Sequence, residues 1–189
     1  LIGIVAPWNY PLSMGVTDAL PALMAGNAVI EKPDSQTPFT LLWALDLLVE
    51  CGLPEDLYQV VYGAGAKLGP ALFVADYLQF TGSTATGRLV AKEAGARLIG
   101  CSLELGGKNP MLVLADADLD HTVGGAVRGC FASAGQLCVS IERIYVHESI
   151  HERFLAAFVA ATRAIRLGVG LAWTYDEPLG DISTVPTFA

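Results

Sequence analysis

The stretch YLQFTGSTATGRLVAKEAG, residues 77–95, joins a short apolar run to a helical pattern through a turn of glycine and hydroxyl residues. Its apolar run predicts a strand that ends at Gly82, and the remainder predicts a helix. Backbone N–H groups at a helix N-terminus bind phosphate, so Gly82 and Ser83 form a candidate phosphate site. Taken alone, the turn is better explained as a Ser/Thr N-cap without a ligand.

Units of a strand followed by a helix recur along the chain. Such alternation predicts right-handed crossovers, a parallel sheet and therefore an α/β fold. The alternation pauses at the pair Gly106 and Gly107, which predicts a boundary between residues 1–106 and residues 107–189. Residues 169–189 carry no clear pattern. We expect strands at residues 1–7, 28–33, 57–63, 77–82, 97–107, 109–116 and 142–150, and helices at residues 12–25, 37–52, 66–75, 83–95, 118–135 and 151–168.

The composition argues against several classes of function. The formal net charge is −8 and no basic tail or stripe is present, which argues against nucleic acid as a partner. Prolines and polar residues interrupt the apolar N-terminal segment, so neither a membrane span nor a signal peptide is predicted. The four cysteines form no Cys-x-x-Cys pair, so we expect no metal site and a reducing, cytoplasmic location.

Three loops that follow predicted strands carry candidate binding residues, because ligands bind at the carboxyl ends of strands in open α/β sheets. Asn9 lies in the first loop, PWNYP, and its amide can donate to a developing oxyanion. The second, EKPDSQTP, places Lys32 at a strand end with Ser35 three residues later. The third, YGAGAKLG, contains Gly65, but its glycines are spaced too widely for a dinucleotide fingerprint. Taken alone, Asn9 is better explained by a packing loop and Lys32 by an exposed lysine. For Gly65, a tight turn and a phosphate-binding turn are about equally favoured.

Glu104 and Cys138 are the candidates for acid–base and nucleophilic chemistry. Glu104 lies in the apolar run LELGG, where an isolated acid is costly to ionise and suits a general base. Its alternative is a structural carboxylate capped by backbone N–H groups. Cys138 follows a glycine-bearing turn in ASAGQLC and should be accessible. The other cysteines are expected to be inert packing residues: Cys51, Cys101 and Cys130.

Five segments occur in one order along the chain: PWNYP, EKPDSQTP, FTGSTATG, LELGGKNP and GQLC. In this order and spacing, the chain resembles the aldehyde dehydrogenase superfamily from its first residue to about residue 168. The resemblance implies a Rossmann-like parallel sheet cofactor domain, residues 1–106. It implies that residues 107–189 are the start of an α/β catalytic domain. Full chains of this superfamily extend beyond both ends of the present sequence.

The resemblance also implies roles for individual residues. Cys138 matches the nucleophile that attacks an aldehyde, and Glu104 matches the base that activates the hydrolytic water. The side chain of Asn9, with the backbone N–H of Cys138, matches the oxyanion hole. The candidate cofactor-binding residues are Trp8, Lys32, Ser35, Gly65, Gly82 and Ser83.

NAD or NADP is the implied cofactor. Relatives specific for NAD often carry an acid three residues after the lysine, where this chain has Ser35, so NADP is favoured. Asp34 opposes this choice, because it would repel a 2′-phosphate. The motifs are most similar to those of the succinate-semialdehyde dehydrogenase branch, although Ser140 replaces a second cysteine that forms a redox disulfide in some relatives. Glu31 stands where the pattern leads us to expect an apolar residue.

The implied reaction converts a small-molecule aldehyde into a carboxylic acid through a cysteine thiohemiacetal and a thioester. The resemblance also implies that the full-length protein is a homodimer or homotetramer. Two alternatives remain open. A CoA-acylating aldehyde dehydrogenase would share Cys138, but such relatives usually lack an acid at the position of Glu104. A catalytically dead, cofactor-binding structural protein is the other.

Overall fold

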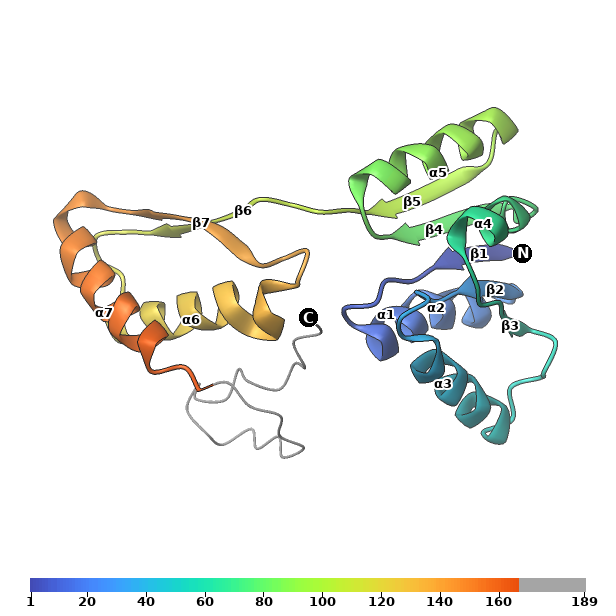
Figure 1. Ribbon diagram of the computed structural model, residues 1–189, viewed down its shortest axis with the longest axis horizontal. Coiled ribbons are helices and arrows are strands. Elements are labelled where there is room, and N and C mark those ends of the chain that lie inside the picture. Colours follow the sequence, from blue (N-terminus) through green and yellow to red (C-terminus); the bar gives the residue numbers. More distant parts are fainter. Residues whose placement is uncertain (167–189) are drawn as a thin grey trace. The chain divides into compact units, whose positions relative to one another are not determined.

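Five short apolar segments of the first hundred or so residues form one parallel sheet (Figure 1). The computed structural model describes residues 1–166. The strand order is β3-β2-β1-β4-β5, so the chain moves outward from β1 to β3 and then returns to add β4 on the other side of β1. This order is that of a Rossmann-like sheet. The strands are β1 (Ile2–Val5), β2 (Val29–Lys32), β3 (Tyr58–Val60), β4 (Tyr77–Thr81) and β5 (Gly100–Glu104).

Helices cover both faces of this sheet, as expected for parallel strands buried on both sides. One apolar core lies between the sheet and α1–α3, where Ile4 and Tyr58 are fully buried. A second core lies on the opposite face against α5, where Phe80 and Ala94 are buried. The helices are α1 (Pro11–Thr17), α2 (Ala19–Met24), α3 (Pro38–Glu50), α4 (Gly65–Leu72) and α5 (Thr84–Arg97).

The single helix expected over residues 12–25 is wrong, because the chain forms α1 and α2 with a break at Asp18. Pro21 explains the break. Its ring would clash with the carbonyl group four residues earlier, at Thr17, in a continuous helix. Ala19, the first residue of α2, is fully buried in the first core.

Helix α3 begins where the sequence predicts, with Thr37 at the N-cap position and Pro38 at the first helical position. The Thr37 side chain makes no capping hydrogen bond, although threonine is common at this position. Its φ of −133° and ψ of 38° lie outside the extended conformation that an N-cap residue normally adopts. The fixed φ of Pro38 therefore starts this helix without help from the threonine side chain.

A second compact unit begins at Gly107, and the first comprises Leu1–Gly106. Two parallel strands pack against two helices around a core that includes Val113, Ala126 and Phe154. The helix expected over residues 118–135 is shorter, because α6 ends at Phe131 and a 3₁₀ turn follows. The elements are β6 (Asn109–Val113), α6 (Leu119–Phe131), η1 (Ala132–Gly135), β7 (Ile141–Val146), η2 (Glu148–Ile150) and α7 (His151–Arg163).

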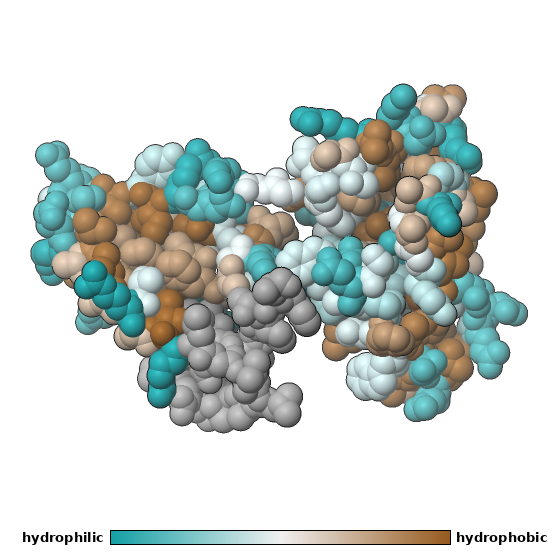
Figure 2. All heavy atoms as spheres, viewed as in Figure 1, coloured by the Kyte–Doolittle hydropathy of each residue, from teal (hydrophilic) through white to brown (hydrophobic). Residues whose placement is uncertain are grey.

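The surface of both units carries apolar side chains (Figure 2). On α3, Phe39 and Trp43 are 81% and 59% exposed, and on β6 Leu112 is 70% exposed. Over residues 1–166, no helix has both the length and the apolar character needed to cross a membrane. The tail of residues 169–189, for which the sequence shows no pattern, lies outside the described residues.

Candidate functional site

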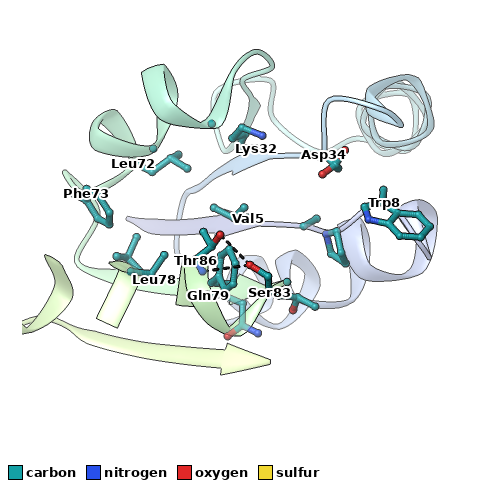
Figure 3. A pocket seen from close by; sticks show the side chains of 18 residues that line it. Val5, Trp8, Lys32, Asp34, Leu72, Phe73, Leu78, Gln79, Ser83 and Thr86 are labelled. Atoms are coloured by element: carbon teal, nitrogen blue, oxygen red, sulfur yellow. Dashed lines mark hydrogen bonds between the residues drawn. The ribbon is translucent and has the colours of Figure 1, made fainter. Parts of the chain in front are cut away.

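A cavity of about 380 Å³ lies within the first unit (Figure 3). It is built from β1, β4 and the turns that follow β1, β2 and β4. Because the strand order reverses between β1 and β4, this is the topological switch point of the sheet, where open α/β folds bind their ligands. The cavity is of the size that small-molecule and cofactor sites have. Its lining includes Trp8, Lys32, Asp34, Gly65, Gly82 and Ser83.

Lys32 supplies the positive charge of this cavity. It is the last residue of β2 and only 7% exposed, and its Nζ donates a 3.0 Å hydrogen bond to the carbonyl of Pro33. Strand alternation turns Lys32 toward the cavity and its neighbour Glu31 toward the opposite face of the sheet. The expected exposed-lysine alternative is therefore wrong, since a mostly buried ammonium group beside a cavity is placed to meet an anion.

The turn between β4 and α5 supplies a helix N-terminus. The Ser83 hydroxyl caps α5 by accepting a 3.2 Å hydrogen bond from the backbone N–H of Thr86. The backbone N–H of Gly82 donates to the carbonyl of Glu104 at 3.0 Å. A Cβ atom at Gly82 would lie 2.8 Å from the ring of Phe80, so a larger residue would require this buried ring to shift. The N-cap interpretation is therefore confirmed, and the same geometry leaves the start of a 14-residue helix beside the cavity.

Asp34 and Ser35 are adjacent in sequence but differ in whether they line the cavity. Asp34 lines the cavity (Figure 3). Its Oδ1 accepts a 2.9 Å hydrogen bond from the backbone N–H of Gln36. Ser35 is exposed and is not among the residues lining the cavity. Gly65 begins α4, and a Cβ atom there would lie 3.8 Å from Cε of Lys32. Asp34 and Gly65 therefore line the cavity together with Lys32, whereas Ser35 does not.

Asn9 and Glu104 also belong to the first unit. Asn9 lies half-buried in the loop between β1 and α1. Glu104 ends β5, and its side chain is exposed rather than enclosed by apolar residues as we expected. The strand stops at Glu104, so the apolar run does not surround its carboxylate within residues 1–166. Its suitability as a base cannot therefore rest on burial in this chain.

Cys138 lies in the second unit, between η1 and β7, and is exposed as the sequence predicts. A left-handed turn precedes it, with positive φ values at Ser133, Ala134 and Gly135. The Asn109 side chain, which the sequence analysis missed, fixes the segment by donating to the carbonyls of Cys138 and Ser140 at 2.6 and 3.0 Å. Its position 29 residues from Cys138 leaves no local pattern to reveal the contact.

The other cysteines differ from the expected packing residues. Cys51 is exposed at the C-terminal end of α3, so the buried interpretation is wrong there. Cys101 and Cys130 are half-buried, and burial raises the pKa of the Cys130 thiol. All four thiols are free. Exposure alone therefore does not distinguish Cys138 from Cys51.

Comparisons with known proteins define the class. The aldehyde dehydrogenase family matches residues 1–181. A Mycolicibacterium smegmatis protein named "putative succinate-semialdehyde dehydrogenase", specified for NADP(+), is 52% identical over 93% of this chain and 34% of its own length. An Acinetobacter baylyi succinate semialdehyde dehydrogenase is 40% identical over 90% of this chain and 36% of its own. The chain therefore belongs to the aldehyde dehydrogenase family.

Solved structures of aldehyde dehydrogenases have the same fold as this chain. A NAD-dependent benzaldehyde dehydrogenase from Corynebacterium glutamicum superimposes with a TM-score of 0.82 and is 40% identical, over 88% of this chain and 37% of that one. The expected Rossmann-like α/β fold is confirmed. The chain spans about a third of the length of the curated relatives that it matches.

Proposed function

We propose that the protein to which this chain belongs is an NAD(P)-dependent aldehyde dehydrogenase that oxidises an aldehyde to a carboxylic acid. The observation that carries the proposal is the cavity at the sheet's switch point, which places Lys32 and the Ser83 helix N-terminus around one space. Family membership supports the same reaction. Residues 1–106 would be the dinucleotide-binding domain, and the second unit would be the start of the catalytic domain.

The cavity fits a dinucleotide in its chemistry. Lys32 would hold the ribose or phosphate at the adenosine end, and the N-terminus of α5 at Gly82 and Ser83 would hold the pyrophosphate. Gly65 and Trp8 would border the bound molecule. Bound NAD(P)⁺ supplies a hydride acceptor, which allows an aldehyde adduct on the protein to become a thioester.

Cys138 performs the covalent step of the proposed mechanism. Its thiolate sulfur forms a bond to the aldehyde carbonyl carbon while the carbonyl π electrons move onto oxygen. The Asn9 amide and the backbone N–H of Cys138 donate hydrogen bonds to that oxyanion. One such donor contributes roughly 3–4 kcal/mol of transition-state stabilisation in other enzymes.

Glu104 completes the turnover by accepting a proton from water. The resulting hydroxide attacks the thioester carbonyl, the carbon–sulfur bond breaks and the electron pair returns to Cys138 as a thiolate. The carboxylic acid product then leaves. Glu104 also supports hydrolysis over transfer to CoA, because it supplies the base that a hydrolytic water needs.

Succinate semialdehyde is the substrate that we propose, and NADP the preferred cofactor. Two relatives named as succinate-semialdehyde dehydrogenases support the substrate, and the one specified for NADP(+) supports the cofactor. The benzaldehyde dehydrogenase named for NAD shows that neighbours of similar identity differ in both respects. We further propose a homodimer or homotetramer in the cytoplasm. Exposed apolar side chains on α3 and β6 support association with further protein surface.

An assay of the full-length protein tests the proposal. Semialdehydes and aromatic aldehydes are each supplied with NAD or NADP, and reduction of the cofactor is followed by absorbance. We expect reduction with a carboxylic acid as the product, with and without added CoA. Acyl-CoA as the main product would instead establish the CoA-acylating alternative. Cofactor binding without oxidation of any aldehyde tested would support the structural alternative.

Asp34→Asn is expected to shift cofactor preference toward NADP. The Asp34 carboxylate lines the cavity near Lys32, so it repels a 2′-phosphate that the lysine attracts. A charge contact at about 4 Å in a water-like environment is worth roughly 1 kcal/mol, so kcat/KM for NADP over NAD should rise about fivefold or more. Exposed Asp46, which is not among the lining residues, provides the control Asp46→Asn. Equal changes with both cofactors would contradict this role.

A further inference from the structure

Glu31 is a fully buried acid on the face of the sheet opposite to Lys32. It lies in β2, is 0% exposed and points toward α1 and the first apolar core rather than into the cavity. Among residues 1–166 no lysine or arginine forms an ion pair with it. A buried carboxylate without a cation is strongly disfavoured, so the surroundings of Glu31 need an account of their own.

Three oxygen atoms lie close together here: Oε2 of Glu31, the Tyr58 hydroxyl oxygen and the Gly15 carbonyl oxygen. They share too few hydrogens if Glu31 is ionised. The Tyr58 hydroxyl oxygen lies 2.8 Å from the carbonyl oxygen of Gly15 and 2.5 Å from Oε2 of Glu31. A tyrosine hydroxyl has one hydrogen to donate, and a carbonyl has none. If Tyr58 donates to Gly15, the short contact to Glu31 requires a hydrogen from the acid. If Tyr58 donates to Glu31, two acceptor oxygens face each other at 2.8 Å.

The pKa shifts of Glu31 and Tyr58 also favour a protonated Glu31. Burial raises the pKa of Glu31 to about 8, its hydrogen bond to Tyr58 offsets part of the shift, and Asp18 adds to it. Burial and the neighbouring Glu31 also raise the pKa of the Tyr58 hydroxyl, so Tyr58 keeps its proton. The second carboxyl oxygen, Oε1, is buried and has no hydrogen-bond partner among the described residues. An unpartnered carbonyl oxygen costs far less than an unpartnered carboxylate oxygen.

We propose that Glu31 is a neutral carboxylic acid in the folded protein and donates from Oε2 to Tyr58, which donates in turn to the Gly15 carbonyl. This chain of two hydrogen bonds fastens α1 to β2 and β3, and deprotonation of Glu31 at alkaline pH loosens that attachment. Helix α1 follows the loop that contains Trp8 and Asn9, so these two hydrogen bonds also restrain that loop. The inference holds whether or not the proposed catalytic function is correct.

The proposal fixes the direction of a pH effect on stability. Below about pH 4.5, Glu31 is neutral in the folded and unfolded states alike. Between about pH 4.5 and about pH 8, the unfolded chain ionises there while the folded chain keeps the proton, so stability falls as pH rises. A difference of one proton changes the unfolding equilibrium constant about tenfold per pH unit. Burial also raises the pKa of Asp18, which acts in the same direction.

The variant Glu31→Gln tests the proposal, because its amide can donate to Tyr58 but cannot ionise. Urea unfolding of the whole chain is measured for both proteins at about pH 5.5 and about pH 7.5. We expect the ratio of unfolding constants, wild type over variant, to rise by about 70-fold between these values. Exposed Glu50 on α3 provides the matched control, and Glu50→Gln should leave the pH dependence of the wild type unchanged. Parallel pH profiles for wild type and Glu31→Gln would overturn the proposal.

A second measurement needs no variant. Carbon-13 NMR of glutamate side-chain carboxyl carbons follows each titration in the wild-type protein. One resonance should titrate near pH 8 while exposed glutamates titrate near their usual value of about 4.3. Titration of every glutamate below about pH 6 would show that Glu31 is ionised at neutral pH, and the proposal would be wrong.

Discussion

Replacing Cys138 with alanine should abolish aldehyde oxidation by the full-length protein. The thiolate forms the only covalent bond to the substrate in the proposed mechanism, so without it no adduct exists from which hydride can leave. Removal of a catalytic nucleophile costs on the order of 10⁶-fold in kcat in a well-studied hydrolase, and we expect a loss approaching that size. Steady-state reduction of the cofactor measures it, and cofactor binding by fluorescence should be unchanged because the cavity lies in the first unit.

Cys51→Ala is the matched control, since Cys51 is also a free and exposed thiol. It lies at the end of α3 and is not among the residues lining the cavity, so its loss should leave kcat within about twofold, as for a surface substitution away from a site. Mass spectrometry adds an independent readout. A thioester adduct should form on Cys138 and not on Cys51. Full activity of the Cys138→Ala protein would refute the mechanism.

Glu104→Gln should stop turnover after the first oxidation. The amide cannot take a proton from water, so the thioester on Cys138 would form but hydrolyse slowly. General-base catalysis contributes about 10²–10⁴-fold, and steady-state kcat should fall by that factor. Rapid mixing should nevertheless show a burst of reduced cofactor equal to the enzyme concentration. The combination of a normal burst and a slow steady state identifies a defect in hydrolysis.

Glu93→Gln is the control for this variant, because Glu93 is an exposed acid on the neighbouring helix α5. Its kinetics should match those of the wild type. A Glu104→Gln protein with no burst would place the action of Glu104 before the thioester and contradict its role as the hydrolytic base. The hydrogen bond from the Gly82 backbone N–H to the Glu104 carbonyl survives the substitution, so the variant tests the Glu104 side chain alone.

The sequence predicts the elements of the fold well because their patterns are local. Apolar runs bounded by glycine and proline are confirmed as β1 to β5, and Ser83 caps α5 as expected. The structure differs from the sequence-based expectation where the effect of a residue depends on the residues around it. Pro21 divides one expected helix into two. Cys51 looks like a core residue in sequence but lies at an exposed helix end.

Some residues of the candidate site can be identified from the sequence, and others only from the structure. The order of the five motifs in the sequence is sufficient to place the chain in its family, and it names Lys32, Gly82, Ser83 and Cys138. It does not show that Asp34 rather than Ser35 lines the cavity, because adjacent residues in a turn differ only in where the backbone directs them. Nor does it reveal Asn109, whose contacts lie 29 and 31 residues away.

By itself the sequence determined that strands and helices alternate, which ends of the strands carry ligand-binding residues, and the family to which the chain belongs. The tertiary structure alone decided that β4 returns to pair with β1, which brings three strand ends around one cavity. It also decided that Glu31, Tyr58 and Gly15 meet across separations of 27 and 43 residues. Periodicity is a property of neighbouring residues, whereas strand order and buried hydrogen bonds depend on packing between distant ones.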